Sequence, residues 1–386
     1  MICIHNARIV TPGHTIEAGW LLTDGEHIAA YGPGSMPDVP DARRIDAEGH
    51  TLLPGFIDVH VHGGAGHDTM DADADGLRAM ARFYARNGVT GFLATTWTDS
   101  HSRIDAAVHA IAEMVGIIDG GATLLGAHME GPYLNVEKTG AQNPRHVRRA
   151  DMDEVRPWLD TGVVRLIAVA PEFPENQALI RECVRRGICV SAAHSSATYE
   201  ELHHAVGLGL RQTTHTFNAM TGLHHRQPGA VGAVLTLPQL KAELIADNIH
   251  VHPVAMKILW QMKGPDGLIM ITDAIRASGL PDGEYPVDER LMTVKEGACR
   301  LPDGTLAGSI ITMNAAIRNL LAATGASLEA IWPATSRTAA RAIGLDHRTG
   351  SIAIGKDADL VLVDAAVNVH MTIARGRIVY EGGQTA

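Results

Sequence analysis

The chain has 386 residues, of which 46% are hydrophobic, and it carries a formal net charge of −11. This length is sufficient for one large α/β barrel with a small accessory domain, and the acidic balance disfavours a nucleic-acid partner, which requires clustered Lys and Arg. No apolar run approaches the roughly 18 residues of a membrane span, so we expect no membrane partner. The first ten residues read as a short strand and lack the basic and apolar regions of a signal peptide.

The two ends of the chain share one pattern. Residues 1–52 read as short strands separated by Gly, Pro and Asp turns, and residues 351–386 contain similar alternating stretches. The sequence therefore predicts that both ends join in one small β-sandwich domain. The metal-dependent catalytic domain is then expected over residues 53–350.

The middle of the chain alternates apolar strands with amphipathic helical stretches, which is typical of parallel βα units. Eight such units over roughly 300 residues predict a closed (β/α)8 TIM barrel. The eight candidate strands are 55–62, 88–95, 123–130, 164–170, 188–194, 212–217, 241–249 and 267–272.

Ionisable residues gather at the carboxyl ends of these candidate strands. In a TIM barrel those ends converge on the face that carries the active site. A single histidine at a strand end proves nothing, but ordinary packing does not explain a whole series at the same end of successive strands. The series consists of His60, His62, Glu130, His194, His215, His250 and Asp273.

One carboxylate and two imidazoles in this series suit a catalytic metal. Glu130, His194 and His215 offer ligands that Zn²⁺ or Fe²⁺ prefers, and they leave a coordination position open for water. Taken alone, Glu130 before its Gly-Pro turn could be a solvated turn acid. His60 and His62 lie on one face of a strand about 7 Å apart, close enough to share an ion, although such a pair alone is a weak signal.

Asp273 is the candidate proton shuttle. Hydrolysis of an amide needs an acid for the leaving nitrogen, and a carboxylate can take a proton from the attacking water and deliver it there. The alternative is that Asp273 caps the following helix.

The four cysteines are scattered and form no CxxC pair, as the positions Cys3, Cys183, Cys189 and Cys299 show. This pattern disfavours a disulfide scaffold or a structural zinc site. We therefore expect a cytoplasmic protein.

Several motifs together resemble the N-acetylglucosamine-6-phosphate deacetylases of the amidohydrolase superfamily. They include PGFIDVHVHG (54–63), GAHMEGPYLN (126–135), THTFNAMTGLHHRQPG (214–229) and ITDAIRASGLPDGEY (271–285). The resemblance covers nearly the whole chain. It implies hydrolytic deacetylation of N-acetyl-D-glucosamine 6-phosphate, with one or two divalent ions, Zn or Fe, bound to each chain.

The resemblance also implies roles for individual residues. It makes Glu130, His194 and His215 the metal ligands and Asp273 the proton shuttle. It assigns Ala141 and Gln142 to the loop over the acetyl group, and Asn218 and Ala219 to the phosphate-binding turn. It assigns His250 to a contact with the sugar. The backbone segment that lines the sugar pocket consists of Leu306, Ala307 and Gly308. Arg226 corresponds to a phosphate-binding arginine that reaches in from the partner subunit, which implies a homodimer.

Three features matter for the comparison with the family. Some members lack the pair His60 and His62 and bind one metal, whereas members with the pair can hold two, so the resemblance implies a second ion here. Gln142 stands where some members have His, so it can donate a hydrogen bond but carries no charge. Asn248 stands where Gly is usual, and we expect it to alter contacts with the sugar hydroxyls.

Alternative functions remain open at this point. The galactosamine epimer or another N-acylated sugar phosphate could be the substrate. A cyclic-amide hydrolase is disfavoured because the fourth strand offers no Lys for carbamoylation. A catalytically dead barrel that acts as a binding protein is disfavoured by the intact ligand set.

Overall fold

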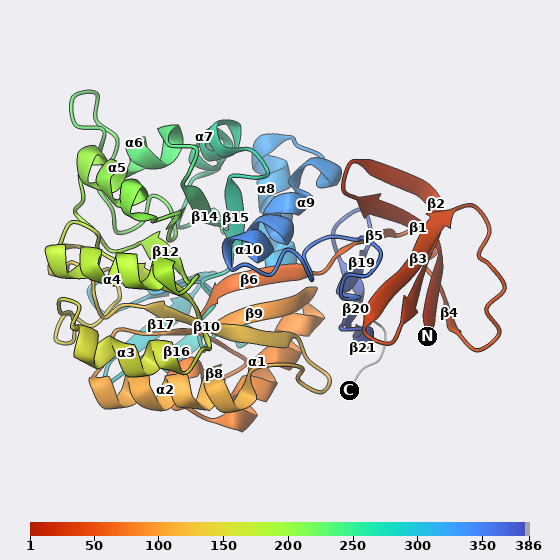
Figure 1. The fold of residues 1–386 in the computed structure, drawn as a ribbon, viewed down its shortest axis with the longest axis horizontal. Coiled ribbons are helices and arrows are strands. Elements are labelled where there is room, and N and C mark those ends of the chain that lie inside the picture. Colours follow the sequence, from red (N-terminus) through yellow and green to blue (C-terminus); the bar gives the residue numbers. More distant parts are fainter. Residues whose placement is uncertain (383–386) are drawn as a thin grey trace.

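The computed structural model describes residues 1–382, which form a barrel and a separate sheet made from both chain ends (Figure 1). The predicted fold class is confirmed, because eight parallel strands follow one another around the barrel. These strands are β6 (Phe56–Val61), β9 (Val89–Thr96), β10 (Thr123–Glu130), β11 (Val164–Val169), β12 (Cys189–Ala192), β13 (Gln212–Thr213), β14 (Lys241–Ile245) and β15 (Leu268–Ile271).

The barrel closes between its first and last strands, β6 and β15. The backbone N–H of Asp273 donates to the carbonyl of His60 over 2.9 Å, and the N–H of His62 donates to the carbonyl of Ala274 over 2.7 Å. Closure therefore places the end of the first strand beside the end of the eighth. The paired histidines and Asp273, which are far apart in the sequence, become neighbours for this reason.

Three strands end two to four residues earlier than predicted. β12 ends at Ala192, β13 at Thr213 and β14 at Ile245, whereas the apolar pattern predicted ends at 194, 217 and 249. His194 and His215 have φ values of 44° and 30°, which leave the extended conformation. The predicted ends of β12 and β13 were wrong because the backbone turns out of the sheet at His194 and His215, and β14 is followed by a turn with a positive φ at Asn248.

Helices cover the outside of the barrel. Local signals begin several of them: the Asp73 carboxylate caps the first helix, and Thr198 forms a capping box with Glu201 at the fifth. The helices are α1 (Ala74–Arg86), α2 (His101–Met114), α3 (Met152–Asp160), α4 (Pro174–Arg185), α5 (Tyr199–Leu208), α6 (Gly229–Thr236), α7 (Pro253–Lys263), α8 (Met313–Thr324), α9 (Leu328–Thr335) and α10 (Arg337–Ala342). Within residues 1–382, none of them has the length and apolar character needed to cross a membrane.

Both chain ends contribute to one further sheet, as predicted. Its order is β21-β20-β19-β5-β1-β2-β3, and β4 also pairs with β1. Buried side chains from both chain ends, such as Ile4 and Leu360, share one core. The strands are β1 (Ile2–Thr11), β2 (His14–Asp24), β3 (His27–Pro33), β4 (Arg43–Asp46), β5 (Thr51–Pro54), β19 (Leu360–Val363), β20 (Val369–Ala374) and β21 (Arg377–Glu381). The division at 1–52, 53–350 and 351–386 stays a prediction, and β5 crosses the first of these boundaries.

Two small sheets lie outside the predicted pattern. The strands β7 (Gly63–Gly64) and β8 (His67–Asp68) pair after β6, and β16 (Gly283–Pro286), β17 (Leu291–Lys295) and β18 (Ala298–Arg300) form an antiparallel sheet after β15. The segment that follows β18 returns to the mouth of the barrel. There Gly308 has a φ of 57°, and a Cβ atom would lie 2.9 Å from the carbonyl oxygen of Asp273, so glycine permits the close approach.

Candidate metal centre

The backbone aims three of the candidate side chains into the barrel mouth. His194, His215 and Asp273 each lie just past a strand end with φ values of 44°, 30° and 50°. A positive φ is uncommon for residues other than glycine, and such conformations cluster at functional sites. The unusual backbone at three strand ends therefore supports the interpretation of this mouth as the active site.

Glu130, His194 and His215 converge as predicted. The Nε2 atoms of His194 and His215 each lie 3.1 Å from Oε1 of Glu130 and 3.1 Å from one another. All three side chains are buried. His194 is also held by its Nδ1 atom, which lies 2.9 Å from the carbonyl oxygen of Lys138.

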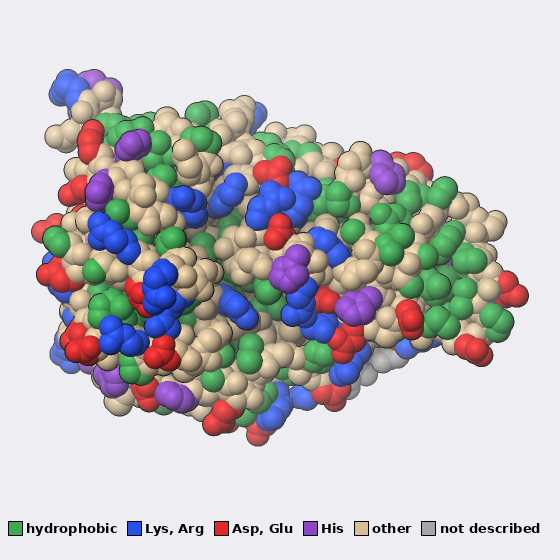
Figure 2. Space-filling model, viewed as in Figure 1, with side chains coloured by type: hydrophobic (Ala, Val, Ile, Leu, Met, Phe, Trp, Pro, Cys, Tyr) green, Lys and Arg blue, Asp and Glu red, His purple; other side chains and the backbone are tan. Residues whose placement is uncertain are grey.

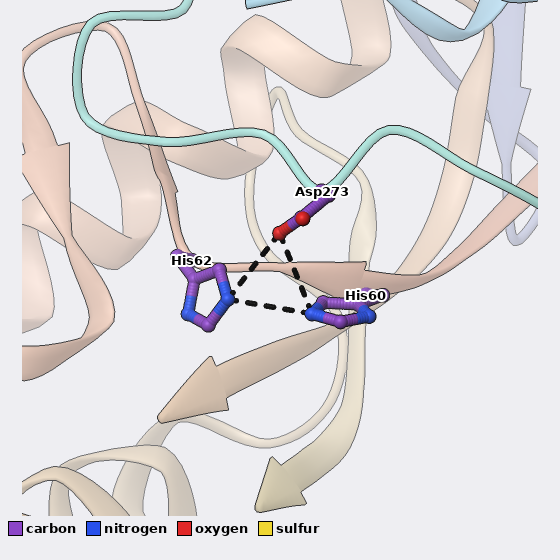
Figure 3. A group of neighbouring side chains, drawn as sticks. All are labelled: His60, His62 and Asp273. Atoms are coloured by element: carbon purple, nitrogen blue, oxygen red, sulfur yellow. Dashed lines mark hydrogen bonds and ion pairs between the residues drawn. The ribbon is translucent and has the colours of Figure 1, made fainter. Parts of the chain in front are cut away.

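His60, His62 and Asp273 form a second triad, which is drawn in Figure 3. The two Nε2 atoms are 3.3 Å apart, and each lies 3.4 Å from Oδ1 of Asp273. The sequence predicted the histidine pair and the aspartate separately, as a metal site and a proton shuttle. The structure brings them into one group.

Glu130 lies between the two triads. Its Oε1 atom faces His194 and His215, while its Oε2 atom lies 3.1 Å from Nε2 of His62. Gln142 donates to the same Oε2 atom over 2.6 Å and accepts from the backbone N–H of Thr98 over 2.7 Å. The amide of Gln142 therefore positions the bridging carboxylate.

The electrostatics of the cluster favour ionised carboxylates. Burial alone would raise the pKa of Glu130, but His60, His194 and His215 hold it well below its usual range. Burial likewise opposes ionisation of Asp273, yet His60 and His62 lower its pKa. Burial would lower the pKa of His62, but Asp273 and Glu130 raise it to about 9.

This donor set fits divalent metal ions. Imidazole nitrogens that face one another at 3.1 Å and 3.3 Å need a proton or a cation between them, and ionised carboxylates supply the balancing charge. Each triad has its ligand atoms within 4.8 Å of one another. Glu130, His194 and His215 can hold one ion, and His60, His62 and Asp273 can hold another.

One pocket contains ligands of both triads and most of the predicted substrate contacts. The lining residues are His62, Trp97, Glu130, Gly140, Ala141, Gln142, His194, His215, Asn218, Ala219, Ile245, His250, Asp273, Thr305, Leu306 and Gly308. His250 is oriented there by a 2.6 Å contact between its Nδ1 atom and Asp247. Three segments distant in sequence, near residues 141, 218 and 306, thus meet around the metal centre.

Four residues considered for the site lie outside that lining, and the first is His60, which is buried as part of the second triad. Ala307 is buried behind it. Arg226 lies in the exposed segment 222–227, where its guanidinium contacts His225 over 2.8 Å, and lines a separate surface cavity. Asn248 is exposed with a φ of 65°, a conformation that Asn and Gly both tolerate, so this departure concerns the backbone turn.

Sequence reasoning missed several residues at the site. Trp97 stacks on His62 with ring centroids 4.0 Å apart, and buried His128 lies edge-on to His60 at 4.6 Å. Glu243 contacts His60 from β14. A signal was available for Glu243, because it interrupts the otherwise apolar run Ala242-Glu243-Leu244-Ile245 inside a buried strand. Nothing in the local sequence distinguishes Trp97.

Residues 51–379 match the amidohydrolase family. The chain belongs to this family. The amidohydrolase is 41% identical over 365 residues to an N-acetylglucosamine-6-phosphate deacetylase of Lysinibacillus sphaericus, covering 94% of this chain and 92% of the relative. It is 37% identical over 366 residues to an N-acetylgalactosamine-6-phosphate deacetylase of Escherichia coli O157:H7, covering 94% and 96%.

A solved structure matches the whole fold. It is that of a point mutant of the N-acetyl-D-glucosamine-6-phosphate deacetylase of Mycobacterium smegmatis, in complex with N-acetyl-D-glucosamine-6-phosphate. The TM-score is 0.91 at 30% identity, covering 98% of this chain and 99% of the other. The resemblance predicted from the motifs is confirmed, and so is the enzyme class, a metal-dependent hydrolase.

Proposed function

We propose that this amidohydrolase hydrolyses N-acetyl-D-glucosamine 6-phosphate to D-glucosamine 6-phosphate and acetate. The observation that carries the proposal is the convergence of Glu130, His194, His215 and Asp273 in one pocket. Relatives that cover nearly the whole chain and bear the name of this activity support it. A divalent ion bound there would polarise the amide carbonyl and acidify water.

Asp273 acts as the proton shuttle in this proposal. His60 and His62 hold its pKa below the usual range, so at neutral pH the side chain is a carboxylate, the form that has a free oxygen for a proton. Delivery of that proton to the nitrogen makes an amine the leaving group in place of an amine anion. Gln142 keeps Glu130 in place at the other side of the pocket.

We propose a centre of two ions, Zn or Fe, because each triad offers three convergent ligand atoms. Imidazole and carboxylate ligands suit both metals. The first ion would be held by Glu130, His194 and His215, and the second by His60, His62 and Asp273. A cytoplasmic location belongs to the same proposal, since all four cysteines are free.

The phosphate group of the proposed substrate supports a homodimer, because it needs a cationic partner. No Lys or Arg belongs to the lining of the pocket within residues 1–382, although Asn218 and Ala219 offer a turn for an anion. The segment 222–227 that carries Arg226 is exposed, and a loop with Lys or Arg and His side chains projects beyond the body of the molecule (Figures 1 and 2). We propose that Arg226 reaches the phosphate in the active site of a second copy of the chain.

The galactosamine epimer remains a second candidate. It is favoured by the relative at 37% identity that is named for the galactosamine substrate. The comparison of N-acetylglucosamine 6-phosphate, N-acetylgalactosamine 6-phosphate and unphosphorylated N-acetylglucosamine decides between them, with acetate release as the readout. We expect the highest kcat/KM for N-acetylglucosamine 6-phosphate. Absence of acetate release from every sugar by metal-loaded protein would favour the binding-protein alternative.

A further inference from the structure

Glu243 is a buried carboxylate of β14 that has no role in the reaction described above. It is 0% exposed. Its Oε2 atom lies 3.0 Å from Nδ1 of His60 and accepts from the backbone N–H of His215 over 3.2 Å, while its Oε1 atom accepts from Gln212 over 2.5 Å. Burial of a charged carboxylate costs free energy, so we expect Glu243 to have a role in positioning the groups that it contacts.

The contact with His60 determines which ring nitrogen faces the metal centre. Because a carboxylate only accepts, Glu243 favours a proton on Nδ1 of His60, which leaves Nε2, the atom that faces His62 and Asp273, as the nitrogen that would bind an ion. In the first triad the carbonyl of Lys138 likewise favours a proton on Nδ1 of His194. The Nδ1 atoms of His62 and His215 have no such partner within residues 1–382.

Glu243 also contributes charge without taking a coordination position. Two divalent ions bring four positive charges into a buried site, and Glu130 and Asp273 among the ligands supply only two negative charges. A third carboxylate behind His60 makes the ring a stronger donor and offsets part of the remaining charge, as second carboxylates behind metal-bound imidazoles generally do.

We propose that Glu243 is a positioning residue that orients and polarises His60 and thereby sets the affinity of the His60–His62–Asp273 triad for the second ion. This inference rests on the proposed two-ion centre. It goes beyond that proposal because it assigns the strength of one site to a residue that does not touch either ion.

The Glu243→Gln variant isolates the effect of the charge. If the amide of Gln212 turns over, the carbonyl oxygen of the introduced amide keeps the hydrogen bonds from His60 and His215, so the shape of the site is preserved. We expect the second ion to bind roughly tenfold to a hundredfold more weakly, as is common when such a partner is lost. The first ion should be retained, because Glu130, His194 and His215 keep all their side-chain contacts.

The experiment measures the zinc content of chelator-stripped protein over a series of buffered free Zn²⁺ concentrations, with thermal unfolding as the check on the fold. Asp58→Asn is the matched control: Asp58 is also buried but accepts from the backbone N–H of His60 over 3.3 Å, not from the ring. This variant should keep wild-type affinity at both sites. In a His60→Asn background, Glu243→Gln should produce no further change.

Each outcome is decisive. Wild-type affinity for two ions in Glu243→Gln overturns the inference and leaves the two-ion centre standing. A weakening that persists in the His60→Asn background also overturns it, because Glu243 would then act through another residue. If the wild-type protein binds a single ion at all Zn²⁺ concentrations, both the inference about Glu243 and the proposed two-ion centre are overturned. If Glu243→Gln does not fold, Glu243→Asp, which keeps the charge but shortens the side chain, is expected to weaken the second ion by the same order.

Discussion

Asp273 has two roles open to it, as a metal ligand and as a carrier of protons. Its Oδ1 atom faces the imidazoles of His60 and His62, and the residue lines the pocket. A carboxamide in its place keeps the shape but can neither accept a proton from water nor deliver one. The two roles can therefore be separated by measuring turnover and metal content in the same variant.

We expect Asp273→Asn to lower kcat by roughly a hundredfold or more, because general acid–base catalysis contributes factors of this size. The ion held by Glu130, His194 and His215 should remain, and the second ion should bind more weakly. Steady-state kinetics and metal analysis check both statements. Near-normal turnover in metal-loaded Asp273→Asn would assign the proton transfer to another residue.

The protonation of His62 predicts how metal binding depends on pH. Its pKa in the metal-free cluster is raised to about 9, so at neutral pH an incoming ion must displace a proton. The apparent affinity of the second site should therefore rise with pH up to about 9, by about tenfold per pH unit for one displaced proton. Zinc titrations of stripped protein at several pH values test this slope, and a flat profile between pH 6 and 8 would contradict it.

At the scale of elements, the junction of the terminal sheet with the rest of the chain contains a further carboxyl group with a shifted pKa. Asp359, directly before β19, accepts from Thr349 Oγ1 over 2.6 Å and from the backbone N–H of Arg375 over 2.8 Å. Burial, together with the charge of Asp357, nevertheless raises its pKa to about 6. The folded protein therefore binds this proton more tightly than the unfolded chain does.

The sign of the stability change follows from that raised pKa. The contribution of protonated Asp359 is fully present below pH 3.8, the usual value, and is lost as the pH rises to about 6. The loss amounts to about 3 kcal/mol of unfolding free energy. In Asp359→Asn the neutral amide keeps both contacts, so this part of the pH dependence should disappear. Denaturant unfolding of both proteins between pH 4 and 7 measures how the free energy of unfolding depends on pH. If this dependence is the same in both proteins, Asp359 is not its source.

At the scale of the whole molecule, the proposed dimer can be tested by exchanging subunits. Arg226→Ala should raise KM for the 6-phosphate substrate steeply and leave hydrolysis of the unphosphorylated sugar nearly unchanged, because a guanidinium suits bidentate phosphate binding. Mixtures of Arg226→Ala and Asp273→Asn chains should recover part of the activity. In a hybrid dimer, one active site receives both intact residues.

Two controls make the mixing experiment conclusive. Exchange of subunits is verified with two differently tagged forms of the chain, and each variant is mixed with itself to define the background activity. If exchanged mixtures show no recovery, Arg226 acts within its own chain or has no part in the reaction.

The sequence alone predicted the fold class and most of the residues that converge at the candidate metal centre. Alternating apolar strands and amphipathic helices indicate a parallel sheet covered by helices, and eight such units over roughly 300 residues match a closed barrel. Since strand ends of a barrel meet at one face, Glu130, His194, His215 and Asp273 could be assigned to one site before the structure was known. The β-rich ends could be assigned to one domain for a similar reason, because short strands need partners.

Only the tertiary structure decided how those residues are grouped. Closure of the barrel makes the first and eighth strands neighbours, which joins His60 and His62 to Asp273. The positive φ values at His194 and His215 end their strands early, and local hydrophobic patterning carries no information about such turns. Glu243 reaches His60 across the barrel interior from β14, 183 residues away in sequence. Contacts of this kind depend on which strands face one another, a property of the closed barrel and not of any one segment.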